Sequence, residues 1–278
     1  MTSSLVITYH AVGNRPLATD PIRKVAAESY TTSLENFVRA LAEVRAEACC
    51  TASEFTDKTR GEWLVLTFDG GLLTDYEHVF PALACRGLRG TFFVTANNVG
   101  KRGYTSPAQL RQMVRAGMEI GSQGLTHRYL ITMTRDEAIR EIRESKEKLE
   151  QELDTAVSSF APAGGHFSRW MPPVAAGSGY RTFATMIPGR TWKRHDFALL
   201  RRNHVRSCHD AAYASRLMRG DRGVLRAGRL RYSLLKLPKT LLGLPLYDRL
   251  KESLFLAAGH RSAGAANNKI QRSPTSCT

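Results

Sequence analysis

The sequence predicts an α/β fold built on a mainly parallel sheet, and three observations carry this prediction. Short apolar, β-branched segments alternate with helical segments of roughly 10–18 residues over most of the chain. Polar residues follow several strand segments, as is typical of the carboxyl ends of parallel strands. The chain has 278 residues, 42% hydrophobic and 23% charged, which is enough for one full-sized core. A barrel and an open doubly wound sheet both fit this pattern.

Strands are predicted where β-branched and aromatic residues cluster between glycine, proline or polar positions. In chain order, these segments cover residues 5–9, 63–68, 90–95, 118–121, 158–161 and 180–186. We place Asp69 in the turn that follows the second segment. His127 lies in a loop after the fourth segment.

Helices are predicted from capping signals followed by apolar residues at helical spacing. Residues 32–35 and 134–137 both match a capping box, and Ser106 precedes a proline at the first helical position. We expect the helix that opens at Thr134 to run to about Leu153. Further helical segments are expected over residues 76–83 and 174–179.

The chain divides into three predicted parts. Residues 1–210 form the α/β barrel, residues 211–258 a basic, partly helical extension that packs on it, and residues 259–278 a disordered tail. Periodicity weakens after about residue 210, where basic residues and leucines mix over residues 222–241. Residues 246–257 fit an amphipathic helix.

Charge is unevenly distributed along the chain. The formal net charge is +15, and residues 211–278 hold 13 Lys and Arg against 3 Asp and Glu. Such a region either attracts an anionic surface or polymer, or is a solvated basic face. No zinc finger, RNP signature or basic zipper accompanies the charge, so no specific nucleic-acid motif is present.

The remaining composition points to a cytoplasmic protein. The five cysteines show no disulfide framework or zinc spacing, which is typical of reduced thiols. No basic leader with a long apolar core opens the sequence, and no apolar run approaches the roughly 20 residues of a transmembrane helix.

Several ordered motifs resemble one enzyme family. They include residues 8–12 (Thr-Tyr-His-Ala-Val), 67–71 (Thr-Phe-Asp-Gly-Gly), 90–95 (Gly-Thr-Phe-Phe-Val-Thr), 119–127 (Glu-Ile-Gly-Ser-Gln-Gly-Leu-Thr-His), 179–182 (Gly-Tyr-Arg-Thr) and 200–202 (Leu-Arg-Arg). Together, residues 5–205 resemble the NodB-homology polysaccharide deacetylases, carbohydrate esterases that remove acetyl groups from glycans. The resemblance implies a distorted (β/α) barrel.

The same resemblance implies roles for individual residues. Asp69 occupies the catalytic base position, and His127 one position of a divalent-metal site, usually zinc or a similar ion. Gly70 and Gln123 occupy the other two ligand positions, normally Asp and His, so Gln123 is a weak ligand and the protein either binds a divalent metal poorly or binds none. Ala161 stands where the family often has an arginine that supports the base.

Further candidates complete the predicted site. Gly165 and His166, in a loop after the fifth predicted strand, are candidate substrate-binding residues. Asp75, His78 and His166 are candidate replacement ligands, and His204 and His209 candidate general acids, although neither histidine lies in the family's usual motif.

Three functions follow as hypotheses. The first is a hydrolase that removes acetyl groups from an N-acetylated glycan, with an impaired or rebuilt metal site. The second is a catalytically inactive homologue that binds glycan or a partner protein. The third is a hydrolase of a small-molecule C–N bond.

Overall fold

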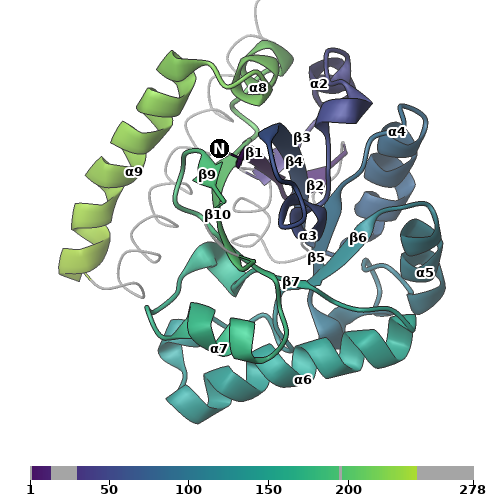
Figure 1. The fold of residues 1–278 in the computed structure, drawn as a ribbon, viewed down its shortest axis with the longest axis vertical. Coiled ribbons are helices and arrows are strands. Elements are labelled where there is room, and N and C mark those ends of the chain that lie inside the picture. Colours follow the sequence, from purple (N-terminus) through teal and green to yellow (C-terminus); the bar gives the residue numbers. More distant parts are fainter. Residues whose placement is uncertain (1, 14–29, 194–195, 243–278) are drawn as a thin grey trace, which may run out of the picture.

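The computed structural model of the protein describes residues 2–13, 30–193 and 196–242, which form a barrel of parallel strands surrounded by helices (Figure 1). Seven parallel strands follow one another around the barrel, and β10 pairs with β1 to close it. They are β1 (Thr2–Tyr9), β4 (Gly61–Gly70), β5 (Thr91–Val94), β6 (Glu119–Ser122), β7 (Ser159–Phe160), β8 (Thr182–Thr185) and β10 (Ala198–His204). The predicted (β/α) barrel is confirmed, and the open sheet is excluded.

Three short strands lie beside the barrel. β9 (Thr191–Trp192) pairs antiparallel with β1, and β2 (Ala11–Val12) pairs with β3 (Thr31–Thr32) in a separate two-stranded sheet. The helices are α2 (Leu34–Leu41), α3 (Ala52–Phe55), α4 (Phe80–Ala84), α5 (Pro107–Arg115), α6 (Arg135–Leu153), α7 (Met171–Gly177), α8 (Ala211–Met218) and α9 (Arg222–Leu242).

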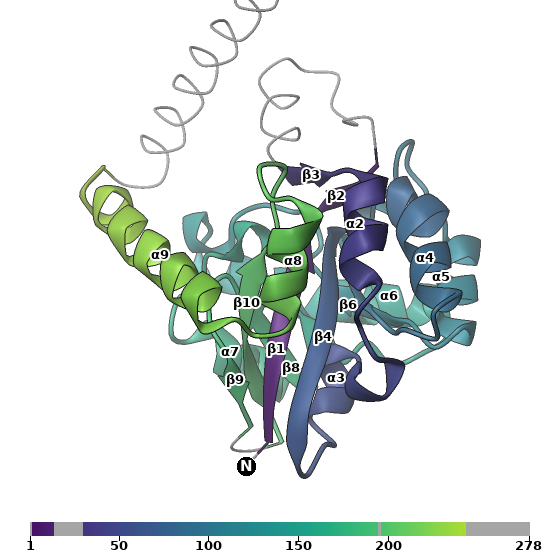
Figure 2. The same cartoon turned by 90° about the horizontal axis from the view of Figure 1, so that it is seen from above.

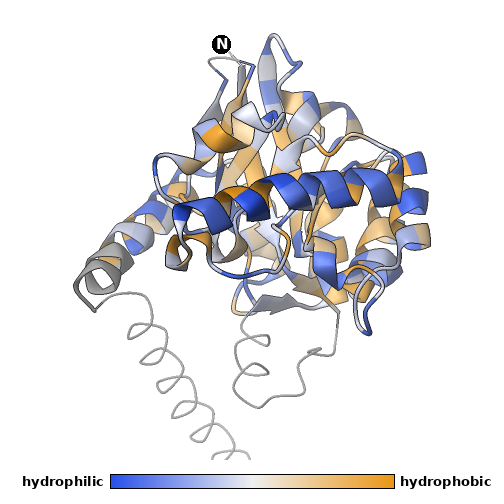
Figure 3. Cartoon of the chain, turned by 90° about the horizontal axis from the view of Figure 1, so that it is seen from below, coloured by the Kyte–Doolittle hydropathy of each residue, from blue (hydrophilic) through white to orange (hydrophobic). Residues whose placement is uncertain are grey.

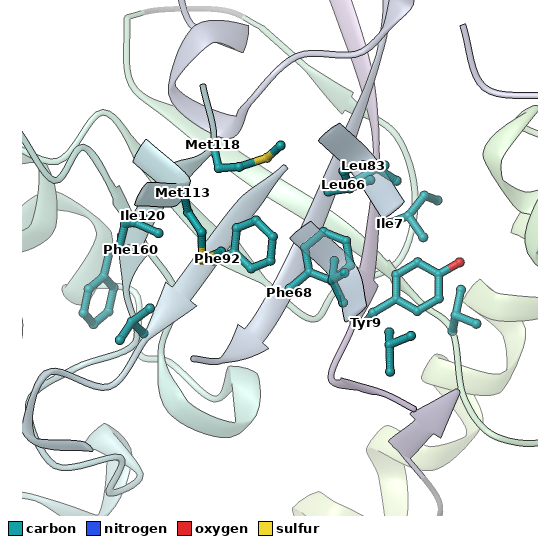
Figure 4. Packing of buried hydrophobic residues seen from close by; sticks show 14 of the residues in the cluster. Ile7, Tyr9, Leu66, Phe68, Leu83, Phe92, Met113, Met118, Ile120 and Phe160 are labelled. Atoms are coloured by element: carbon teal, nitrogen blue, oxygen red, sulfur yellow. The ribbon is translucent and has the colours of Figure 1, made fainter. Parts of the chain in front are cut away.

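Alternation along the strands separates two apolar layers, because successive side chains of a strand point to opposite faces. Phe68, Phe92 and Phe160 belong to the large cluster between the strands and the helices (Figure 4). Val65 and Phe93 belong to the second cluster, together with Leu200 of β10. Asp69 follows Val65 by four residues, so it shares that second face and lies inside the barrel.

Capping signals predicted two helix starts well and one poorly. Ser106 and Thr134 both form capping boxes, with Gln109 and Glu137, and α6 ends at Leu153 as expected. The box predicted at Thr32 is wrong, since Thr32 pairs in β3 and Ser33 caps α2 by accepting a hydrogen bond from the Asn36 amide. In Figure 3, α6 crosses the outside of the barrel and is coloured mostly hydrophilic, while its buried residues include Ile142 and Leu149.

Two further differences concern local geometry around β4. Asp69 lies within β4, and the turn predicted at Asp69 comes after the strand has ended at Gly70. The helical segment after it begins as a π-helix at Asp75–Val79 and continues as α4.

The region after residue 210 is helical as far as it is described. α8 packs on α2, and Arg219 just after it forms an ion pair with Glu43. α9 is a continuous helix where the sequence showed no clear periodicity. The segments predicted over residues 246–257 and 259–278 lie outside the described residues, and the division at residues 210 and 258 stays a prediction. No helix among the described residues combines the length and apolar character needed to cross a membrane.

Candidate active site

A buried ion pair lies inside the barrel at the carboxyl ends of its strands. Arg202 of β10 donates a hydrogen bond from Nη1 to Oδ1 of Asp69 on β4, at 2.6 Å. Asp69 is 4% exposed and the Arg202 side chain is fully buried. A buried charge is costly unless it is paired, so each of these two groups depends on the other.

Arg202 is fixed by contacts beyond Asp69. Its Nε donates to the Thr185 carbonyl at the end of β8 at 3.1 Å, and its Nη2 lies 3.3 Å from the Met186 sulfur. The guanidinium also lies over the Phe93 ring, 5.4 Å from the centroid. Arg202 therefore connects β4, β5, β8 and β10 across the barrel interior.

Two histidines lie next to this ion pair. His10 follows β1 and His204 ends β10, and the two adjacent strands bring His10 Nδ1 within 3.0 Å of His204 Nε2. The Tyr30 ring stacks on both imidazoles. Burial lowers the pKa of His10 to about 4, although the Asp69 charge opposes this shift. Burial also lowers the pKa of His204, so both rings are neutral near pH 7.

His127 lies in the loop after β6 and is exposed. Partial desolvation lowers its pKa, and the charges of Asp69 and Glu141 act in the opposite direction. Glu141 of α6 holds this loop by accepting hydrogen bonds from the amides of Leu125 and Thr126. His127 itself has a positive φ of 64°, an uncommon conformation for a residue other than glycine.

Gly70 and Gln123 lie at the ends of β4 and β6. Gly70 has a φ of 123°, and a Cβ added there would lie 3.2 Å from Leu72 Cγ. Gln123 is buried, and its Oε1 has no hydrogen-bond partner among the described residues. An unpaired buried carbonyl oxygen is unfavourable unless a ligand or solvent satisfies it.

The loop after β7 holds Gly165 and His166. Gly165 has a φ of 71°, and a Cβ there would overlap Met186 Cγ at 2.0 Å, so packing explains this glycine. The His166 ring packs edge-on against Tyr129, with the centroids 5.5 Å apart. A role of either residue in substrate binding stays a prediction.

Comparisons with known proteins agree with this geometry. Residues 56–183 match the family model described as polysaccharide deacetylase. The protein YxkH of Bacillus subtilis (strain 168), whose name describes it as a polysaccharide deacetylase, is 25% identical over 150 residues, which is 54% of each chain. The chain is therefore similar to polysaccharide deacetylases in sequence and in fold.

Solved structures of this family share the barrel. The Streptococcus pyogenes deacetylase PplD, in complex with acetate, superimposes with a TM-score of 0.67 at 18% identity, over 78% of this chain and 98% of its own. The polysaccharide deacetylase BC0361 of Bacillus cereus gives 0.65 at 20% identity, over 78% and 69%. The chain spans about half the length of the curated relative that it matches.

The residues present do not match the metal ligands that are usual in polysaccharide deacetylases. Gly70 supplies no side chain at its position, and Gln123 offers a neutral amide oxygen in place of an imidazole. Across residues 2–13, 30–193 and 196–242, no three His, Cys, Asp or Glu side chains are grouped closely enough to hold a metal ion. We therefore assign no catalytic step to a metal.

The candidate replacement ligands Asp75 and His78 and the candidate general acids have contacts away from the Asp69–Arg202 pair. Asp75 is buried and accepts a hydrogen bond from the Leu72 amide, and desolvation raises the pKa of its carboxyl well above the usual value. His78 lies in the π-helix beside Gly13. His209 accepts a hydrogen bond from the Arg206 amide and stacks on Tyr213, while His204, the other candidate general acid, is bonded to His10.

Sequence reasoning assigned no role to two residues of this candidate site. Arg202 pairs with Asp69, a contact that the family resemblance would assign to an arginine at position 161, where Ala161 is buried in the barrel interior. His10 was noted within a family segment without a role. Arg202 continues the inward-facing alternation of Leu200 in β10, and His10 continues that of Val6 in β1. This alternation near a strand end is the signal that could have identified both residues.

Proposed function

We propose that this chain is a deacetylase-like hydrolase that removes acetyl groups from an N-acetylated glycan, with Asp69 as general base. The observation that carries this proposal is the buried Asp69–Arg202 pair at the carboxyl ends of the barrel strands. Active sites of α/β barrels form at these strand ends. His10 and His127 lie beyond the carboxyl ends of β1 and β6, at the same end of the barrel.

The chemistry follows from how Asp69 is held. Arg202 occupies Oδ1, so Oδ2 remains to accept a proton from a water that attacks the acetyl carbonyl carbon. The C–N bond then breaks to give acetate, and protonated Asp69 returns its proton to the leaving amine. His10 and His127 are neutral near pH 7 and can donate or accept hydrogen bonds to the acetylated sugar.

A second candidate function is glycan binding without turnover. Gly70 and Gln123 at the ligand positions favour it, since a deacetylase that lacks its Lewis acid loses a large part of its stabilisation of the oxyanion. Hydrolysis of a small-molecule C–N bond and a cytoplasmic location both stay predictions from the sequence.

Acetate release from chitin oligosaccharides tests the proposal. The purified chain is assayed with EDTA, and separately with zinc or cobalt, beside Asp69→Asn and the exposed control Asp136→Asn. Release that persists in EDTA, is lost in Asp69→Asn and is kept in Asp136→Asn supports the proposal. The same Asp69 chemistry predicts that acetate and free amine form in equal amounts.

Release that requires added metal and is lost in Asp69→Asn would keep the hydrolase and would mean that a metal site exists in a form we have not assigned. Release that is unchanged in Asp69→Asn would overturn the role of Asp69. Saturable oligosaccharide binding by calorimetry with no release in any condition supports the binding function instead.

A further inference from the structure

α9 is attached to the barrel through its first turn and is exposed further along. Val224 and Leu225 are buried, and Asp221 accepts hydrogen bonds from the Gly223 and Val224 amides at the start of the helix. From Arg229 to Leu234 every residue is exposed. Figure 2 shows α9 extending away from the barrel beyond α8.

The exposed part of α9 carries large apolar side chains. Leu230 is 62% exposed and Leu234 is 65% exposed, and Tyr232 between them is also exposed. Two more leucines, Leu237 and Leu241, follow in the sequence, so the four leucines are separated by 4, 3 and 4 residues. This spacing places four leucine positions on one stripe of the helix.

The same helix is strongly basic. Between Asp221 and Asp248 the sequence contains no acidic residue, and α9 holds six basic ones: Arg222, Arg226, Arg229, Arg231, Lys236 and Lys239. On the helical wheel, Arg222, Arg226 and Arg229 lie along one side of the leucine stripe, with Arg226 at its edge. Arg231 lies along the other side. Charge of one sign over a whole helix requires an anionic partner or solvent.

We propose that α9 lies on the surface of an anionic lipid membrane, with its leucine stripe inserted between the headgroups and the basic residues that flank the stripe on the lipid charges. Helices that lie in the membrane interface combine a leucine face with a Lys/Arg face in this way. Charge complementarity decides for an anionic bilayer, and the leucines decide against a polysaccharide or nucleic acid, which offers them little apolar surface.

Vesicle flotation of the full chain tests this proposal. We expect binding to vesicles with 30% phosphatidylglycerol in phosphatidylcholine, weak binding to phosphatidylcholine alone, and a decrease as salt increases. Leu230→Ser/Leu234→Ser keeps every charge and should lower the partition coefficient at least about tenfold. Arg226→Gln/Arg231→Gln should lower it by a similar factor, because each basic residue near the surface contributes about fivefold.

The controls separate membrane binding from misfolding and from general charge. Arg140→Gln/Arg143→Gln removes two exposed arginines from α6 and should leave flotation unchanged. All of these positions are exposed, so circular dichroism and the thermal midpoint of each variant should match the wild type.

Three outcomes would overturn the proposal. The first is equal binding to vesicles with and without phosphatidylglycerol, or no binding to either. The second is full binding by Leu230→Ser/Leu234→Ser together with equally tight capture by dextran sulfate, which would assign the helix to an anionic polymer. The third is self-association in analytical ultracentrifugation that this leucine variant abolishes, which would assign the stripe to a second copy of the chain.

Discussion

Arg202 donates a 2.6 Å hydrogen bond to Asp69 across 133 positions of the sequence, and both side chains are buried inside the barrel. The two residues come from strands that are not neighbours in the barrel, since β1 lies between β4 and β10. The pair is therefore a contact through the interior of the barrel and depends on its closure.

Removing one partner of this pair should destabilise the protein strongly. We expect Arg202→Met to lower the free energy of unfolding by about 3–5 kcal/mol, because it leaves the Asp69 carboxylate buried without its partner. Urea denaturation at pH 7 measures this loss. Arg39→Gln, which breaks the exposed pair with Glu35 at 3.6 Å, should cost less than about 1 kcal/mol. Asp69→Leu/Arg202→Met should regain part of the loss, and an additive double variant would show that the pair does not form in solution.

Asp75 should make stability decrease as pH rises. Desolvation raises the pKa of its carboxyl well above the usual value, with the Asp69 charge adding to the shift. Its contribution is complete below the unfolded pKa of about 4 and is lost as pH rises toward the folded pKa. Asp75→Asn removes this proton linkage, so its free energy of unfolding should fall less between pH 5 and pH 8 than that of the wild type. Parallel slopes for the two proteins would contradict the neutral carboxyl.

His10 should make stability decrease as pH falls. Burial lowers its pKa to about 4, so its contribution is present above the unfolded pKa of about 6.5 and is lost as pH falls toward 4. We expect His10→Gln to flatten the decline in unfolding free energy between pH 6.5 and pH 4.5. A His10→Gln curve parallel to the wild type would mean that burial does not lower the pKa of His10.

Restoring the family's ligand types tests the assignment of Gly70 and Gln123. Gly70→Asp/Gln123→His should bind zinc, measured by calorimetry and by a zinc-dependent rise in Tm. Without zinc it should be less stable by about 1–3 kcal/mol, since Gly70 has a φ of 123° that a residue with a Cβ rarely adopts. Gln123→His alone should bind zinc much more weakly. If the folded double variant shows no zinc response, the positional match to the family motif is wrong.

Local signals in the sequence predicted the elements that depend on local physics. Ser106 and Thr134 initiate helices because their side chains satisfy free amides of the first turn. Asp69 was located because it directly follows an apolar, β-branched segment. Thr32 failed as a cap because pairing of β3 with β2 holds its backbone in a strand, and Ser33 takes the capping role.

Long-range contacts could not be read from the same signals. The Asp69–Arg202 pair and the His10–His204 bond both require β10 to close on β1, and no local pattern encodes that closure. α9 escaped detection for another reason. Its leucines from Leu230 to Leu241 keep helical spacing, but basic residues are interleaved with them, and only its first turn is buried among the described residues.

Closure of the barrel by β1 and β10 also sets the order in which the protein can be completed during synthesis. The ribosome releases β1 first and β10 after every other barrel strand, yet Val6 must pair with Arg202. Asp69 thus leaves the ribosome well before its cationic partner, which follows 133 positions later. Water is excluded from the Asp69–Arg202 pair only when β10 joins the barrel. Because this step depends on contacts between distant parts of the sequence, we expect it to be slow, and the unclosed chain is the form that a chaperone or a protease would recognise.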